Sequence, residues 1–179
     1  MINNSTEGKI LLLDNLIDKV KSLKHEGKIV VQTHGVFDLI HVGHLRHLKE
    51  AAELGDILVV TITEDEKVNK GPGRPVFSEQ LRAEMLAALE IVDFVGINRH
   101  ASAENIINTI QPDIYIKGPD YANEDDDITG KISVEQQAVE KNGGRVVFTD
   151  DITFSSSTLI NQYLDVYDPE LQDFLHDAR

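Results

Sequence analysis

Two histidines, His41 and His44, flank Gly43 at a point where the apolar pattern changes from a strand to a helix. The preceding residues 29–31 form a short apolar run, and from Leu45 onward apolar residues recur at helical spacing. The first turn of a helix carries unpaired N–H groups and about half a positive charge, so it favours phosphate. Gly43 allows a ligand to approach the backbone closely. The pair therefore indicates imidazole donors that stabilise charge on a reacting phosphate.

Two other interpretations of these histidines stay open. A single histidine is more often an ordinary surface or core residue than a ligand-binding one. A metal site is the second alternative, because His47 follows His44 at the same spacing. Residues three apart drift by about 60° around a helix axis, so three such ligands would converge poorly. The chain has no cysteine, which excludes a thiolate zinc site, a disulfide scaffold and a cysteine nucleophile.

Around this motif, short apolar runs alternate with segments of helical periodicity. Strands are expected at 29–31, 57–62, 92–97, 114–116 and 146–148, and helices at 12–23, 45–54, 78–89, 102–110 and 134–141. Such alternation predicts an α/β domain with a parallel sheet, and continuous apolar runs fit burial on both faces of that sheet. We expect a single Rossmann-like, doubly wound domain with about five parallel strands.

A chain of 179 residues has room for one domain. We expect an N-terminal helix within 1–27, the functional domain over 28–165 and a short helical tail over 166–179. Ligands of such folds bind at the carboxyl ends of the strands.

The net charge of −14 makes the chain a poor candidate for binding nucleic acid or an anionic membrane. An anionic ligand must therefore be met by a local group of cations and donors. No apolar run reaches ~18 residues, and residues 1–10 lack the apolar core of a signal peptide. A soluble, cytoplasmic protein is expected.

The stretch Gly-Val-Phe-Asp-Leu-Ile-His-Val-Gly-His at 35–44 closely resembles the HxGH signature of the nucleotidyltransferase α/β-phosphodiesterase superfamily, in its cytidylyltransferase-like branch. The resemblance continues through the loop at 63–76, through the KGxDY element Lys117–Tyr121, and through Phe154–Ile160, which is similar to the family's ISxTxI motif. Within this branch, the chain is most similar to the adenylyltransferase domain of bifunctional heptose-phosphate enzymes.

The resemblance implies transfer of a nucleoside monophosphate from ATP, or from CTP as the second choice, to a sugar phosphate. The products would be a nucleoside-diphosphate sugar and pyrophosphate, with Mg²⁺ bridging phosphate oxygens; no protein ligand of the metal is identified. The attacking phosphate is mostly dianionic at pH 7, since its second pKa is near ~6, so no strong general base is required. Catalysis should depend on positioning and electrostatics.

The resemblance also assigns roles to individual residues. The catalytic residues are His41, His44 and Lys70; the nucleotide-binding residues are Gly35, Val36, Phe37, His41, His44, Ser155, Ser156 and Ser157; the substrate-binding residues are Arg74, Lys117 and Asp120.

Several of these assignments have structural alternatives. Phe37 is equally consistent with core packing, Lys70 with a solvated loop position, and the three serines with simple capping of a helix. Arg74 and Arg82 either face the phosphates or pair with acidic neighbours. Asp38 is expected to fix the loop rather than touch a ligand.

The chain departs from its relatives near the second motif. Asp150 or Asp151 stands where glycerol-phosphate cytidylyltransferases carry an arginine, and Asn161 and Gln162 stand where many relatives have a lysine. Lys70 or Lys117 must then supply the missing cation, and the KGxDY element favours ATP over CTP.

Two alternative functions remain open. One is a glycerol- or polyol-phosphate cytidylyltransferase that uses CTP, and the other is a nucleotide-binding module paired with a separate sugar kinase. A homodimer is what the family implies.

Overall fold

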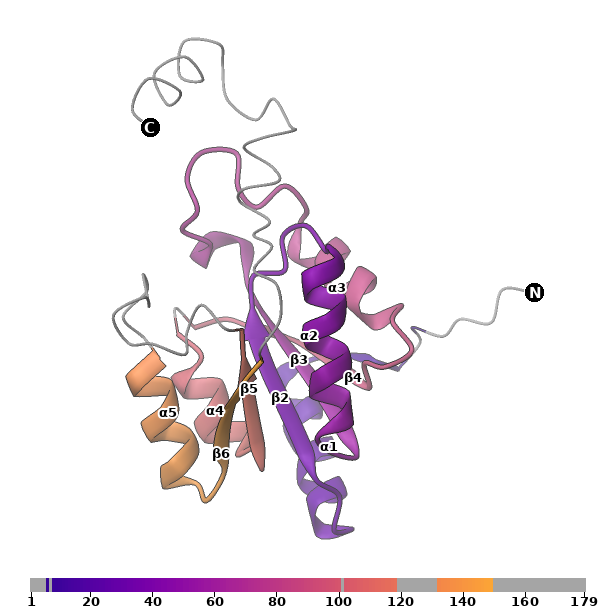
Figure 1. Cartoon of the computed structure of the whole chain (residues 1–179). Helices are drawn as coiled ribbons and strands as arrows, with labels where there is room; N and C mark the ends of the chain where they lie inside the picture. The colour runs from indigo at the N-terminus through magenta and orange to yellow at the C-terminus, as the bar shows by residue number, and fades with distance from the viewer. Residues whose placement is uncertain (1–5, 7, 101, 119–131, 150–179) are drawn as a thin grey trace, which may run out of the picture.

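The structure of the chain is a computed structural model that describes residues 6, 8–100, 102–118 and 132–149 (Figure 1). The strands are β1 Ile10–Leu11, β2 Val30–Gly35, β3 Ile57–Thr63, β4 Phe94–Asn98, β5 Ile114–Lys117 and β6 Arg145–Phe148. The helices are α1 Leu13–His25, α2 Val42–Glu53, α3 Glu79–Ala87, α4 Glu104–Ile110 and α5 Ile132–Lys141, with a 3-10 turn η1 at Asp65–Lys67. The expected α/β alternation is confirmed, with element bounds shifted by a few residues.

All six strands belong to one parallel sheet in the order β1-β4-β3-β2-β5-β6. From β2 the chain builds outward through β3 and β4, then returns to the other side of β2 to form β5 and β6. The point where the order reverses lies between β2 and β5, and ligands of open α/β sheets bind outside the carboxyl ends of the strands at such a point. The expected fold class is confirmed.

One strand was not expected from the sequence. Strand β1 has only two residues, Ile10 and Leu11, which pair with Val95 and Gly96 of β4. A two-residue strand is too short to show an alternating pattern, so hydrophobic periodicity does not reveal it. The sheet therefore has six strands rather than about five.

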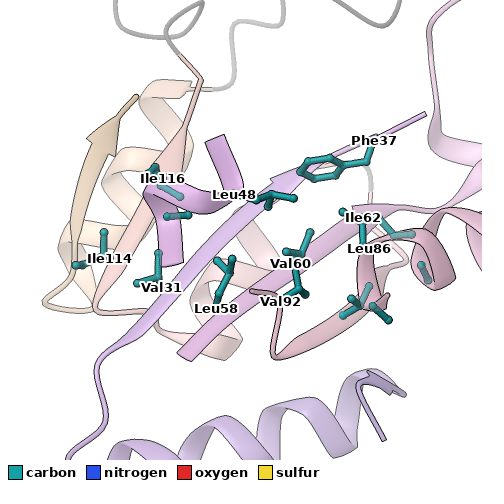
Figure 2. Packing of buried hydrophobic residues seen from close by; sticks show 14 residues of the cluster. Val31, Phe37, Leu48, Leu58, Val60, Ile62, Leu86, Val92, Ile114 and Ile116 are labelled. Atoms are coloured by element: carbon teal, nitrogen blue, oxygen red, sulfur yellow. The ribbon is translucent and has the colours of Figure 1, made fainter. Parts of the chain in front are cut away.

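Each face of the sheet is covered by its own apolar cluster. Helices α2 and α3 cover one face, and helices α1, α4 and α5 cover the other (Figure 1). Val31 and Val60 point to the first face and belong to the same apolar cluster as Leu48 of α2 (Figure 2), whereas Val30 and Val59 point to the second face. Neighbouring strand residues alternate between the faces, so both faces are buried only if nearly every strand residue is apolar.

The helix expected within 1–27 is α1, whose buried residues Leu16 and Val20 join the cluster on the second face. The tail expected at 166–179 lies outside the described residues, so the proposed domain bounds stay predictions. None of the helices in the described part of the chain has the length and apolar character needed to cross a membrane.

Arg82 of α3 connects the carboxyl ends of β2 and β3 while being fully buried. Its guanidinium donates to the backbone oxygens of Val36, which follows β2, and of Thr63, at 2.8 Å. The same group donates to the Phe77 oxygen at 3.0 Å and pairs with Asp65 at 2.7 Å. Of the two interpretations of Arg82, pairing with an acidic neighbour is therefore the one observed. Arg82 holds the loop that leads to His41.

We predict that Arg82→Lys lowers the free energy of unfolding by about 2–4 kcal/mol, because one ammonium cannot satisfy three buried carbonyls and a carboxylate together. The matched control is Arg99→Lys: the Arg99 side chain is 57% exposed and pairs with Glu64 and Glu79, so its loss should cost at most about 1 kcal/mol. Urea denaturation followed by circular dichroism measures both. Equal stabilities of the two variants would contradict the role given to Arg82.

A second stability prediction concerns Gly55, just after α2. A Cβ there would lie 2.6 Å from Val31 Cγ2 and 2.8 Å from the Ile29 backbone oxygen. Because the Ile29 oxygen already accepts hydrogen bonds from the backbone N–H groups of Asp56 and Ile57, it cannot retreat without weakening them, and Gly55→Ala should lower stability by about 1–3 kcal/mol. The exposed Glu53→Ala is the control and should change little. A Gly55→Ala protein as stable as wild type in the same denaturation assay would show that β2 yields easily.

Candidate active site

Helix α2 begins directly after the loop that follows β2. Its N-cap residue is His41, which has extended backbone angles (φ −134°, ψ 176°) and makes no capping hydrogen bond with its side chain. The first turn of α2 carries no acidic residue. The positive end of this helix therefore lies at the carboxyl edge of the sheet without a carboxylate of its own first turn to neutralise it.

The rings of His41 and His44 stack on each other, with centroids 3.9 Å apart and an interplanar angle of 23°. The Phe37 ring also contacts His44, in a tilted arrangement with a centroid distance of 5.1 Å. Phe37 is only 6% exposed and belongs to the apolar cluster of the α2 face, so its side chain packs in the core (Figure 2). The predicted pair of imidazoles is thus brought together, and the Phe37 ring packs against His44.

Gly35 is required by the same packing. A Cβ at this position would lie 3.1 Å from Cε2 of the Phe37 ring. Phe37 itself has a φ of +50°, a left-handed conformation that turns the chain sharply after Gly35. The turn brings the Phe37 ring into contact with His44. A contact of Gly35, Val36 or Phe37 with nucleotide stays a prediction.

Burial makes both histidines poor bases. It lowers the pKa of His44 to about 3, helped by His41, His47 and Lys70 and opposed by a hydrogen bond with the Leu39 backbone. Burial also lowers the pKa of His41, and the Lys70 ammonium lowers it further. Because their pKa values are lowered, both rings are neutral at pH 7. A neutral imidazole has one N–H donor and one acceptor. The pair is suited to donating hydrogen bonds to phosphate oxygens rather than to carrying fixed charge.

Asp38 organises the loop beside this pair. Its carboxylate accepts hydrogen bonds from Arg74 Nε at 2.5 Å and from the Val76 backbone N–H at 2.6 Å. The side chains of Asp38 and Arg74 are 0% and 1% exposed. Asp38 thus fixes the loop, as the sequence indicated, and Arg74 pairs with an acidic neighbour, one of its two expected roles.

One donor group of Arg74 is nevertheless left without a hydrogen bond. Its Nη2 atom is buried and has no hydrogen-bond partner among the described residues. A buried donor that stays unsatisfied costs about 1–3 kcal/mol, so the protein keeps this atom open at the expense of stability. Lys70 lies nearby: burial lowers its pKa, Arg74 lowers it further, and Asp38 raises it. Among the described residues, the two cations and the two imidazoles form one cluster, in which Asp38 is the carboxylate that pairs with Arg74.

Lys117 is placed at the carboxyl end of β5, across the switch point from the histidines. Its Nζ lies 2.9 Å from the Glu135 carboxylate, and its side chain is 9% exposed. Tyr115 also donates to Glu135, at 3.0 Å, and the Lys117 ammonium lies 5.7 Å from the Tyr115 ring centroid. The substrate role predicted for Lys117 remains a prediction, and Glu135 would compete for its charge.

The remaining predicted site residues cannot be placed. Asp120, Ser155, Ser156 and Ser157 lie outside the described residues. Within the residues that the structure does describe, no group of three or more metal-ligating side chains converges. His47, considered as a third metal ligand, instead has its two ring nitrogens on threonine hydroxyls. Sequence spacing gave no sign of these partners, because one of them is Thr149, far along the chain.

Comparison with known proteins places the chain in a family. The family model described as cytidylyltransferase-like matches residues 33–162. The bifunctional protein HldE of Syntrophotalea carbinolica is 41% identical over 165 residues, which cover 90% of this chain and 32% of that protein. HldE of Campylobacter fetus is 46% identical over 117 residues, or 64% of this chain and 25% of that protein. The chain spans about a third or less of these relatives.

Two solved structures share the fold. A lipopolysaccharide core biosynthesis protein from Thermoplasma volcanium is 28% identical with a TM-score of 0.59, over 71% of this chain and all of that one. Pantoate-β-alanine ligase from Francisella tularensis, solved with a β,γ-ATP ligand and β-alanine, has a TM-score of 0.61 over 87% of this chain and 73% of that one. Its 13% identity shows the fold alone.

The 35–44 stretch, the first of the segments that carried the resemblance, leads from the end of β2 into the start of α2. The match over 33–162, the relatives at 41% and 46% identity and the parallel sheet agree with one another. They show that the chain belongs to the cytidylyltransferase-like family of nucleotidyltransferases.

Proposed function

We propose that this domain transfers an adenylyl group from ATP to the phosphate of a sugar phosphate. A sugar-phosphate oxygen attacks the α-phosphorus of ATP, the bond from that phosphorus to the bridging oxygen of the β-phosphate breaks, and pyrophosphate leaves with both electrons of that bond. The observation that carries the proposal is the cluster of His41, His44, Lys70 and Arg74 at the positive end of α2.

The physical problem of this reaction is to bring two polyanions together on a protein with a net charge of −14. The His41 and His44 rings supply hydrogen-bond donors for oxygens of the α-phosphoryl group as its charge is redistributed. Lys70, an exposed lysine close enough to His41 and His44 to lower their pKa values, supplies an ammonium for the phosphates. The Arg74 Nη2 atom supplies a further donor. It is already removed from water in the free protein, so binding of a phosphate does not have to desolvate it.

The sugar-phosphate half of the proposal draws on the relatives. One solved relative is described as a lipopolysaccharide core biosynthesis protein, and the curated relatives are named bifunctional. We propose a heptose-type sugar phosphate as the first substrate to test, formed by a sugar kinase. The cytoplasmic location and the homodimer are also proposals that the family suggests. Lys117 and Asp120 are the proposed contacts of the sugar phosphate.

The family generally uses a divalent metal, and we propose Mg²⁺. The described residues do not fit a site that holds this ion by themselves, because Asp38 already accepts hydrogen bonds from Arg74 and Val76. Mg²⁺ often binds through substrate phosphates and water with only one or two carboxylates. The ion would therefore arrive on the nucleotide, where it neutralises part of the phosphate charge.

A second candidate function is cytidylyl transfer from CTP to glycerol phosphate or another polyol phosphate. It is favoured by the family description, cytidylyltransferase-like, and by the general shape of the 35–44 motif. A strict requirement for CTP would select it.

The decisive assay is pyrophosphate release with ATP or CTP against a panel of heptose, glycerol and other polyol phosphates, with Mg²⁺ present. We expect turnover with ATP and a heptose phosphate. His44→Ala should lower kcat by about 10²–10³-fold, as does the loss of one donor to a developing oxyanion. His25→Ala, an exposed histidine at the end of α1, is the control and should keep wild-type kcat. Near-normal turnover of the His44 variant would remove His44 from the mechanism.

Nucleotide binding should also take up protons. Burial and Lys70 hold the pKa of His41 below its ordinary value, and that of His44 is about 3 in the free protein. A bound triphosphate favours the imidazolium form and so raises both pKa values. At a pH between the free and bound values, protons are absorbed, and this uptake grows as the pH falls toward 6.

Calorimetry with a non-hydrolysable ATP analogue, in two buffers of different ionisation enthalpy at pH 6, measures the uptake. ATP itself titrates in this range, so the informative quantity is the difference from His44→Asn, which should take up fewer protons. An uptake equal in wild type and variant would place the triphosphate away from His44.

A further inference from the structure

His47 lies one helical turn beyond His44 on α2 but belongs to a different set of contacts. Its Nε2 atom lies 2.9 Å from the Thr33 hydroxyl on β2, and its Nδ1 atom lies 3.3 Å from the Thr149 hydroxyl. Thr149 follows the last residue of β6. One imidazole thus joins α2, β2 and the end of β6, which come from three distant parts of the chain.

The surroundings of Thr149 select the tautomer of His47. The Thr149 hydroxyl donates to the Lys117 backbone oxygen at 3.4 Å, and the Thr149 backbone N–H donates to the same oxygen at 2.9 Å. A hydroxyl has one hydrogen, so its oxygen is left to accept. Nδ1 of His47 must then carry the proton, and Nε2 must accept from the Thr33 hydroxyl.

The bridge is also uncharged, and both of its hydroxyl-bearing residues are buried. Thr33 and Thr149 are 1% and 2% exposed. Burial lowers the pKa of His47 to about 4, and the Lys117 ammonium at the end of β5 lowers it further. Within the described part of the chain, His44 is also electrostatically coupled to His47, and His44 is itself neutral at pH 7. A neutral ring with one donor and one acceptor matches the two hydroxyls, whereas an imidazolium would present two donors.

The hydrogen bonds of His47 bear on the position of α2 relative to the sheet. The buried apolar residues of α2 are Leu48 and Ala51, and apolar contacts resist separation from the sheet without fixing a register along the helix axis. Hydrogen bonds are directional, so the two at His47 fix both the axial position and the rotation of the first turns. His41 and His44 lie on those turns.

We propose that His47 is a positioning residue of the nucleotidyl-transfer site: as the Nδ1–H tautomer it fastens α2 to β2 and to the end of β6, and so sets the position of the His41–His44 pair. The effect on turnover rests on the function proposed above. The tautomer and its dependence on Thr149 do not.

The first test is therefore a spectroscopic one. Long-range ¹H–¹⁵N correlation of the imidazoles in the full chain should show His47 as the neutral Nδ1–H tautomer between pH 6 and 8. Thr149→Val removes the hydroxyl at nearly constant shape and should switch His47 to Nε2–H, whereas Thr149→Ser should not. A wild-type Nε2–H tautomer, titration near the ordinary pKa, or a tautomer indifferent to Thr149→Val would each overturn the proposal.

The second test is kinetic. Thr149→Val should lower kcat by about 10–100-fold, since a small misplacement of catalytic groups costs that much, while Thr149→Ser keeps most of the activity. Rates are measured well below the thermal midpoint of each variant, so that loss of folded protein does not contribute. A fully folded Thr149→Val protein with wild-type kcat and KM would overturn the positioning role.

The two tests separate the hypotheses. If the wild-type chain turns over none of the substrate pairs, the proposed function fails. The spectroscopic result then still decides whether His47 makes the bridge, and calorimetric affinity for an ATP analogue replaces kcat: a wild-type affinity in Thr149→Val would overturn the positioning role, and a weakened one restored by Thr149→Ser would support it.

Discussion

Strand β2 is paired on both sides, with β3 and with β5, and the chain leaves it at the one place where the sheet order reverses. Connections on the two sides of this point run apart, so the carboxyl end of β2 is left uncovered by either crossover. The residues after β2 must therefore form their own structure, supported by Arg82 and Asp38. The stacked histidines, the cations and the start of α2 all depend on this opening.

The site contains buried guanidinium groups, whose removal from water costs free energy. Two arginines are almost fully buried, and each is held by an acid and by backbone oxygens or a neighbouring loop. Arg82 uses its donors on the protein, whereas Arg74 keeps Nη2 unsatisfied. The contrast separates a cation that builds the scaffold from one that is available to an anion.

The features predicted from the sequence are those that depend on near neighbours. The His41–His44 pair, the start of α2 and the strand–helix alternation follow from local spacing, and so did the role of Asp38 in its loop. For Arg82, the sequence indicated an acidic partner as one alternative but not which residue it is. Strand β1 was missed because two residues are too few to show an alternating pattern. The bridge from His47 to Thr149 joins residues 102 positions apart, and only the folded sheet brings them together. The serines and Asp120 lie outside the described residues.

The unexpected strand β1 has a consequence for solubility. Without it, the outer side of β4 would expose the unpaired backbone groups of a nearly uncharged segment, Phe94–Asn98, to any other strand. The two residues of β1 pair with Val95 and Gly96, and α1 begins almost at once, at Leu13. The new edge is too short to template a further strand. Strand β1, directly before α1, thus protects this edge of the sheet against edge-to-edge aggregation.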